Sequence, residues 1–395
     1  MNKAEQLVFN ICRKSFLSLW SYLRPTGKNA KELCDVLVVC EPDLIIFSVK
    51  DIQIKESGDD ARDWSRWTRK AIDESSKQIY GAERWLKTAA TVIRNDGTPG
   101  LTLPTLTERR VHRIAVAFGG KNKVPLVFGD FGKGFIHVFD ETSFDIVMGE
   151  LNTITDFVTY LTAKEELVAA GTRIDNFSAE EDLMALYLNN GRRFPQGFTH
   201  YVVTGPIWET FIKKPEYKKK QKADRASLMW DGLIEKFAED ILGDNLEFGG
   251  PLTKAEKGIR IMAREDRFSR RILGKSFSDF YLLTKTKYGS RITPAPSGVI
   301  YVFLALPHRT ERKHRIAVLG TRCFVARGLN PTSHHVLGIA TEQDKPGKGF
   351  SLDLHYLYLP YWNKKLQTAF KRMQRDLGYF TKPSKKVGDE DEYPK

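Results

Sequence analysis

The sequence predicts a mixed α/β fold, α+β overall, in which a compact N-terminal core is followed by a larger mixed α+β region. Three observations predict it. Two apolar, β-rich runs at residues 33–40 and 44–49 are separated by Glu41-Pro42-Asp43, which is typical of an antiparallel hairpin. Helical patterns flank this hairpin on both sides, and further strand and helix patterns follow beyond residue 105.

The segment before the hairpin, residues 3–23, predicts an amphipathic helix because its apolar residues recur at helical spacing. Glu5 falls on the same stripe as Phe9 and Phe16. A carboxylate there either serves a site or gains from the helix dipole in the first turn. The turn-forming run Arg24-Pro25-Thr26-Gly27 ends the helix.

The polar residues of the hairpin are its most informative feature. If the numbers of paired residues add to an odd sum, Asp35 lies on the same face as Ser48 and Lys50. A carboxylate and an amine held together on two strands can bind a divalent metal and steady a phosphate. The alternative is a salt bridge at the end of the sheet. Glu32, at the mouth of the hairpin, is either a further ligand or a solvated residue.

The segment after the hairpin predicts a second long helix over residues 64–93, with Gln78 on its buried stripe. A buried amide needs hydrogen-bond partners from the backbone or from a site. Three cationic residues recur every seven positions on an adjacent flank: Lys70, Lys77 and Arg84. Such a line can follow a phosphate backbone or simply face water.

The order of these elements carries a resemblance. A helix with Glu5, a strand with Asp35, a second strand with Ser48-Val49-Lys50 and a following helix with Gln78 resemble the core of the PD-(D/E)-x-K nuclease superfamily. That superfamily includes restriction endonucleases, Holliday-junction resolvases of the archaeal type and exonuclease domains. The resemblance covers about residues 3–93 and implies a restriction-endonuclease-like core.

The resemblance also implies roles. Asp35 would be the central metal-binding carboxylate, Glu5 the helix acid that completes the site, and the metal Mg²⁺ or Mn²⁺. Lys50 would orient or activate the attacking water and stabilise the transition state. Gln78 would be the polar residue that some branches carry on the helix after the hairpin. With Ser48, these residues form the expected catalytic set.

Ser48 departs from the pattern, because the superfamily usually has an acid two residues before the lysine. A hydroxyl is a poorer ligand than a carboxylate for a hard cation. Either the acid has moved, with Glu32, Asp43 or Asp51 as candidates, or the site binds metal weakly or has lost activity. Asp51 alternates to the opposite face from Lys50, which favours Glu32 as the third metal ligand.

Turn-rich residues 94–100 predict a boundary, which gives a nuclease-like domain over residues 1–95 and two α+β domains over residues 105–212 and 226–380, the second with a basic helix and a strand meander. Residues 381–395 are predicted to be a disordered tail. The lysine-dense residues 213–222 predict a mobile linker. The expected later elements are strands at 111–118, 124–128, 135–139, 200–204, 299–306, 314–319, 323–327, 335–340 and 351–359, and helices at 144–170, 179–188, 228–242, 254–273 and 362–377.

The predicted helix at residues 254–273 is the most basic in the chain and is the preferred duplex contact outside the core. Its cations are Arg260, Arg264, Arg267, Arg270 and Arg271. A solvated face paired with neighbouring acids is the alternative. One short similarity, between residues 107–116 and 310–318, suggests a duplicated strand unit or arises by chance.

Composition favours an acidic partner. A formal charge of +13 and a pI near 9.4 suggest nucleic acid, most of all double-stranded DNA, rather than a membrane. No apolar run approaches the length of a membrane span, and no signal peptide is recognisable. Four unpaired cysteines favour a reducing compartment, so we expect a cytoplasmic protein. The sequence leaves open whether it forms a homodimer.

These observations lead to competing hypotheses. The first is a Mg²⁺-dependent DNA endonuclease, which by analogy would serve restriction or anti-phage defence. The second is a protein that keeps the nuclease core but binds nucleic acid without cutting it. A third keeps the hydrolase and changes the substrate to RNA or branched DNA. The sequence leaves cleavage specificity, activation and the role of residues 105–380 undetermined.

Overall fold

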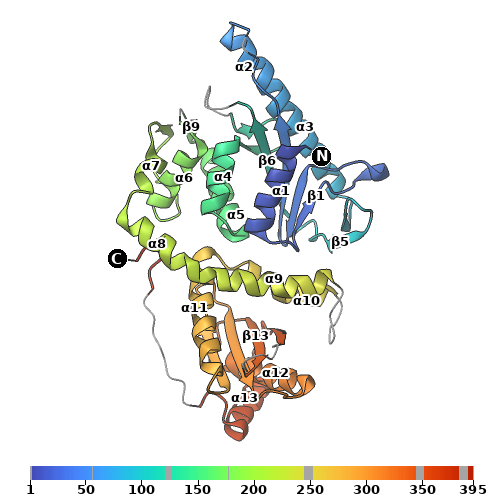
Figure 1. The fold of residues 1–395 in the computed structure, drawn as a ribbon, viewed down its shortest axis with the longest axis vertical. Helices are drawn as coiled ribbons and strands as arrows, with labels where there is room; N and C mark the ends of the chain where they lie inside the picture. The colour runs from blue at the N-terminus through green and yellow to red at the C-terminus, as the bar shows by residue number, and fades with distance from the viewer. Residues whose placement is uncertain are drawn as a thin grey trace. The chain divides into compact units, whose positions relative to one another are not determined.

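The structure, a computed structural model, describes residues 2–55, 57–120, 127–176, 178–243, 252–343, 351–381 and 390–394. The chain divides into two compact units, Met1–Lys218 and Lys219–Lys395 (Figure 1). Each unit has its own mixed sheet with helices beside it, so the predicted mixed α/β class is confirmed. No helix in the described residues is long and apolar enough to cross a membrane.

The first unit is built on a six-stranded sheet. In sheet order its strands are β1 (Ser21–Leu23), β2 (Val36–Cys40), β3 (Asp43–Asp51), β6 (Arg110–Phe118), β8 (Phe135–Phe139) and β7 (Gly129–Asp130). Strands β3, β6 and β8 are mutually parallel, and the other pairs are antiparallel. The central strands are rich in Val, Ile and Phe because both of their faces are covered.

Helices cover the two faces of this sheet. They are α1 (Lys3–Phe16), α3 (Glu74–Leu86), α4 (Glu141–Glu150) and α5 (Ile154–Ala169). Helix α2 (Asp60–Thr68) precedes α3, and α6 (Glu180–Asn189) packs against α4. Helix α3 packs against β3 and β6, whereas α1 and α4 contact each other and pack against the sheet through contacts such as Phe47 with Phe144. A short π-helical turn, Arg69–Asp73, joins α2 to α3.

Smaller elements complete the first unit. They are the short helical turn Lys28–Ala30, the hairpin β4 (Thr91–Ile93) and β5 (Pro99–Thr102), the parallel pair β9 (Arg173–Asn176) and β10 (His200–Val203), and helix α7 (Ile207–Phe211). A second short turn, Arg225–Ser227, belongs to the second unit. Helix α8 (Pro215–Asp224) carries the chain from the first unit into the second.

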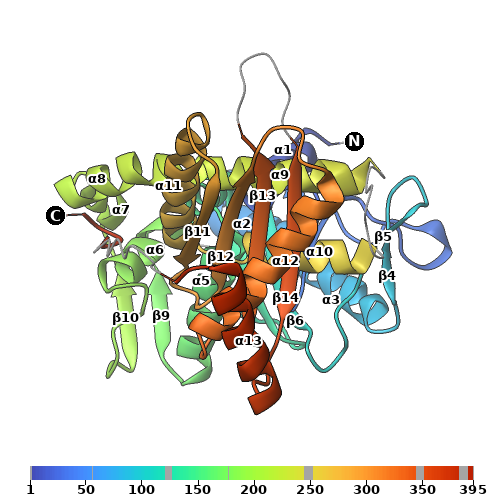
Figure 2. The same ribbon diagram turned by 90° about the horizontal axis from the view of Figure 1, so that it is seen from below.

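The second unit has a four-stranded sheet in the order β11 (Gly289–Pro294), β12 (Ile300–Leu306), β13 (His335–Glu342) and β14 (Leu352–Tyr358), with β12 and β13 parallel (Figure 2). Its helices are α9 (Leu228–Leu242), α10 (Leu252–Ala263), α11 (Arg267–Thr284), α12 (Arg312–Leu329) and α13 (Lys364–Leu377). Helix α12 covers one face of the sheet. On the other face, Trp230 of α9 and Phe277 of α11 pack against β12.

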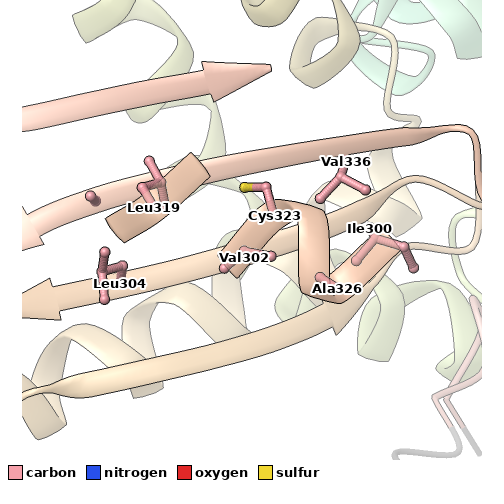
Figure 3. Packing of buried hydrophobic residues seen from close by; sticks show 8 residues of the cluster. Ile300, Val302, Leu304, Leu319, Cys323, Ala326 and Val336 are labelled. Carbon is pink, nitrogen blue, oxygen red and sulfur yellow. The ribbon is translucent and has the colours of Figure 1, made fainter. Parts of the chain in front are cut away.

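The core beneath α12 is formed by alternate residues of β12 and β13 with the inner face of the helix (Figure 3). Its buried members are Ile300, Val302, Leu304, Leu319, Cys323, Ala326, Val336 and Ala340. Gly338 lets the helix approach β13, because a Cβ atom added there would lie 2.6 Å from the Cys323 Sγ atom and 2.7 Å from the Leu319 Cδ1 atom.

We expect Gly338→Ala to lower the free energy of unfolding by about 1–3 kcal/mol, because overpacking forces helix and strand apart. Gly289→Ala is the matched control, since a Cβ atom there meets nothing within 4 Å. Urea unfolding followed by circular dichroism measures both variants. Equal stability of the two variants would show that the core accommodates the added methyl group.

Several predicted elements are confirmed: the hairpin, β6, β8, β10, β12, β13 and β14, and the helices α6, α9 and α13. Others were wrong in extent. The first helix ends at Phe16, the second ends at Leu86, and the predicted helices at 144–170 and 254–273 are each split in two. The strand predicted at 124–128 falls largely on residues 124–126, outside the described residues.

Three predictions were wrong in kind. Residues 213–222 lie mainly in helix α8 rather than in a mobile loop or linker. The strands predicted at 314–319 and 323–327 are both part of helix α12, and the strand meander is wrong because this helix crosses over between the parallel strands β12 and β13. The similar runs at 107–116 and 310–318 therefore enter a strand in one unit and a helix in the other, so they do not mark a duplicated strand unit.

The expected boundary at residues 94–100 does not bound the first sheet, because β6 pairs with β3 along its whole length. Of the tail, residues 382–389 lie outside the described residues, whereas residues 390–394 contact helix α11. The four cysteines are buried free thiols, as predicted.

Candidate functional site

The register of the hairpin decides which side chains can meet. Val36 pairs with Phe47 and Cys40 with Asp43, so paired numbers add to an odd sum. Continuing this register by one residue sets Asp35 opposite Ser48. Asp35, Ser48 and Lys50 therefore share one face, as the sequence predicted.

Asp35 is the buried centre of this group, with 4% of its surface exposed. Its Oδ2 atom accepts a hydrogen bond of 2.6 Å from the backbone N–H of Val49. The pKa of Asp35 is raised to about 6, chiefly by burial, with Glu32 and Glu5 also raising it and the Val49 N–H and the Lys50 ammonium group lowering it. The two other predicted acids are therefore close enough to act on Asp35 electrostatically.

Gln78 joins the hairpin from helix α3. Its Oε1 atom accepts hydrogen bonds from Ser48 Oγ at 2.8 Å and from Lys50 Nζ at 3.0 Å. The π-helical turn Arg69–Asp73 lies one helical turn before it, and such turns inside helices are frequent at functional sites. Ser48 and Lys50 are thus the hydrogen-bond partners that the Gln78 amide was expected to need, and the amide holds the lysine in place.

Glu5 and Glu32 meet through Arg24, a residue that the sequence argument missed. The Arg24 Nε atom donates to Glu32 Oε2 at 2.5 Å and lies 3.7 Å from Glu5 Oε2. This Glu5 oxygen is buried and accepts no hydrogen bond within the described residues. Arg24 stands in the turn Arg24-Pro25-Thr26-Gly27, whose proximity to Glu32 depends on the pairing of β1 with β2.

The donor chemistry fits a hard divalent cation. Carboxylate oxygens are what Mg²⁺ prefers, and both the unsatisfied Glu5 oxygen and the raised pKa of Asp35 indicate incompletely neutralised acids. Glu5, Asp35 and Glu32 are the residues that would hold it. The described residues contain no group of three or more acidic, histidine or cysteine side chains already arranged as a metal site. Arg24, bonded to Glu32, would have to move first.

The other proposed replacements for the missing acid lie elsewhere. Asp43 forms a buried pair with His112, with 2.9 Å between Oδ1 and Nε2, at the opposite end of β3. Asp51 is exposed on the opposite face from Lys50. The Ser48 hydroxyl is buried and donates to Gln78. Of the three candidate replacements, Glu32 is the one that raises the pKa of Asp35.

The basic residues predicted to bind nucleic acid fall into two groups. Lys70, Lys77 and Arg84 are exposed on the π-helical turn and α3. The second group, on α10 and α11, differs from the expectation of one exposed basic helix. The predicted helix is interrupted between Ala263 and Arg267, where Asp266 caps α11 by accepting a hydrogen bond from the Ser269 N–H.

The arginines of this second group are largely buried. Arg267 and Arg270 donate to Asp231 at 2.6 and 2.7 Å, and Arg271 donates to Asp224 at 3.1 Å. Arg260 lies 3.5 Å from Glu256, and Arg264 is half-buried. Arg267 is therefore an ion-paired residue rather than an exposed duplex contact, and Arg271 is covered both by Asp224 and by the backbone of Asp391 and Glu392. Half-buried acids of α8 and α9, distant in sequence, decide this.

Comparisons with known proteins add nothing to these observations: no protein-family model matches the chain, and neither the curated proteins nor the solved structures gave a match.

Proposed function

We propose that the first unit is a metal-dependent nuclease that hydrolyses phosphodiester bonds of DNA. The observation that carries the proposal is the convergence on Asp35. A buried carboxylate, two further acids and a lysine fixed by an amide gather from α1, the hairpin and α3. Phosphodiester hydrolysis needs a positioned water and neutralisation of the charge that develops on phosphate, which such a group supplies with a divalent cation.

Each residue has a role in this proposal. Asp35, Glu5 and Glu32 hold the cation, which when bound polarises the phosphate and lowers the pKa of a water molecule. The Lys50 ammonium group lies within reach of the same face and orients the water or stabilises the charge on phosphate. Gln78 is a positioning residue, because its Oε1 atom fixes the Lys50 Nζ atom.

The order of elements supports the resemblance to the PD-(D/E)-x-K nucleases. Helix α1, strands β2 and β3 and helix α3 come in the order that the resemblance implies. Glu5 lies on α1, Asp35 directly precedes β2, and Lys50 lies on β3. The exposed Lys70, Lys77 and Arg84 supply positive charge for a phosphate backbone. By analogy, the setting would be restriction or anti-phage defence in the cytoplasm, with a homodimer as one assembly.

One observation favours the alternative, a protein that binds nucleic acid without cutting it. Ser48 replaces the expected acid and is fully engaged with Gln78, while Arg24 already neutralises part of the acid group. In that case the site would bind no divalent cation. RNA or branched DNA as substrate would keep the same chemistry.

The test is a cleavage assay on plasmid, linear, single-stranded and junction DNA and on RNA, with Mg²⁺ or Mn²⁺ titrated. We expect metal-dependent cutting of DNA that EDTA stops. Calorimetry with Mn²⁺ separates the two hypotheses, because the non-catalytic protein should bind nucleic acid but no metal. Cutting in EDTA at an undiminished rate would contradict the proposed mechanism.

Arg24→Gln should tighten Mn²⁺ binding by about tenfold, because the variant removes a positive charge that neutralises the same carboxylates. Calorimetry at pH 8 measures the affinity. Arg13→Gln, at the exposed end of α1, is the control for net charge. Weaker binding by the Arg24 variant would mean that the guanidinium group holds the acids in the binding arrangement instead of competing with the metal.

A further inference from the structure

An acidic segment at residues 390–394 lies against helix α11 of the second unit. The Arg271 NH2 group donates to the backbone oxygen of Asp391 at 2.6 Å, and its NH1 group donates to that of Glu392 at 3.1 Å. The Lys275 Nζ atom donates to Glu390 Oε1 at 2.5 Å. The segment therefore covers cationic side chains of α11 with its carbonyl groups and one carboxylate.

The guanidinium group of Arg271 is only partly satisfied by this segment. Its side chain is 2% exposed, yet its Nε atom makes no hydrogen bond within the described residues. The nearest segment carboxylate, that of Glu390, lies 3.7 Å away from this atom. Arginine is matched best by an anion that accepts two parallel hydrogen bonds, as phosphate does. The segment offers two neutral carbonyl groups in that place.

The surroundings are cationic. Lys275 is 59% exposed beside its Glu390 partner, and the Lys220 Nζ atom lies 5.9 Å from the centre of the Tyr393 ring. On the other side, Asp224 contacts both Lys220 and Arg271 and fixes their positions. Further exposed cations stand on or next to α8: Lys219, Lys222 and Arg225.

We propose that Arg271, Lys275 and Lys220 form a phosphate-binding surface for the backbone of DNA, and that residues 390–394 occupy it in competition with DNA. Asp224 accepts a hydrogen bond from the Arg271 NH1 group, so departure of the segment frees the NH2 donor beside an Nε donor that makes no hydrogen bond within the described residues. The acidic side chains of the segment stand in for part of the charge that phosphate would bring.

This proposal does not rest on the proposed hydrolysis, because every residue in it belongs to the second unit. Binding can be measured in EDTA, where a metal-dependent site is silent. The proposal can therefore fail while the nuclease holds, and the reverse.

The experiment uses the full chain and a fluorescent DNA duplex, with binding followed by anisotropy in EDTA at low salt. Glu390→Arg removes the carboxylate that bridges Lys275 and Arg271 and repels the segment from both. We expect about fivefold tighter binding and a salt dependence steeper by about one unit of log K per log salt, as expected for one added phosphate contact.

Glu239→Arg is the matched control, because it makes the same change in net charge at an exposed residue of α9. Lys275→Gln in the Glu390→Arg background tests the surface itself and should cancel most of the gain, at a position too exposed for unfolding to be the cause. Thermal melting of each variant records whether the second unit stays folded.

Three results would overturn the proposal. Equal gains from Glu390→Arg and Glu239→Arg would reduce the effect to bulk charge. Unchanged affinity together with a lower melting temperature would make the segment a structural brace. An acidic peptide that binds the Glu390→Arg chain as tightly as DNA at the same ionic strength would assign the surface to an acidic protein.

Discussion

Lys50→Ala should lower the rate of metal-dependent DNA cleavage at least about a hundredfold, which is typical for the loss of one electrostatic catalytic group. The lysine is half-buried on β3, and its ammonium group is held 3.0 Å from the Gln78 Oε1 atom. Alanine leaves that oxygen bonded to Ser48, so the fold around the site should persist. Single-turnover cleavage at saturating enzyme measures the chemical step.

Two controls accompany this variant. Lys14→Ala removes an exposed lysine of α1 and should cut at the wild-type rate. Binding of a DNA duplex by Lys50→Ala, measured in EDTA, should change far less than its rate. Wild-type cleavage by Lys50→Ala would remove this lysine from the mechanism, whereas an equal loss of binding and rate would make it a substrate contact only.

Asp35→Asn should abolish Mg²⁺ and Mn²⁺ binding and cleavage while making the metal-free protein more stable at pH 8. Asparagine can still accept the Val49 N–H but carries no charge. The folded pKa of Asp35 is about 6, against about 3.9 for an unfolded aspartate. Ionised Asp35 therefore costs about 2–3 kcal/mol of folding free energy at pH 8.

The sign of this effect gives a pH test. A folded pKa above the unfolded one favours the folded state below about pH 4, and the advantage is lost as the pH rises through about 6. In EDTA, the stability difference between Asp35→Asn and the wild type should thus be small at pH 4 and grow up to pH 7. Urea unfolding across this range measures it. A pH-independent difference would contradict the charge argument.

Added metal should then reverse the order of stability. Mn²⁺ raises the melting temperature of a chain that binds it in the folded state, so the wild type should gain and Asp35→Asn should not. An equal rise in the melting temperature of Asp35→Asn would mean that the cation is held elsewhere. A folding free energy lowered by ionised Asp35 in the metal-free protein is expected of a site that binds a positively charged ligand.

Much of the candidate site could be predicted from the sequence because strand periodicity is local. Alternation along each strand places Asp35 on one face with Ser48 and Lys50 if the paired numbers add to an odd sum, and the register of the hairpin meets that condition. The helical stripe with Gln78 follows likewise from spacing alone. These patterns depend only on backbone geometry, which is the same in every fold.

Arg24 and the arginines of α11 could not be predicted in this way. The position of Arg24 beside Glu5 and Glu32 requires β1 to fold back along β2, and Arg267 is neutralised by Asp231, which stands 36 residues earlier. Ion pairs between residues distant in sequence are made by packing, and an exposed and a buried arginine look the same in a linear pattern.

The sequence by itself determined the mixed α/β class, the central hairpin and the alternation of polar and apolar residues along its strands, because propensity and periodicity act over a few residues. Tertiary structure decided the rest. The identical runs at residues 113–116 and 315–318, Arg-Ile-Ala-Val, become part of strand β6 between two parallel neighbours and part of helix α12 above a sheet. Short apolar runs suit either backbone, and the surface that each must bury selects one.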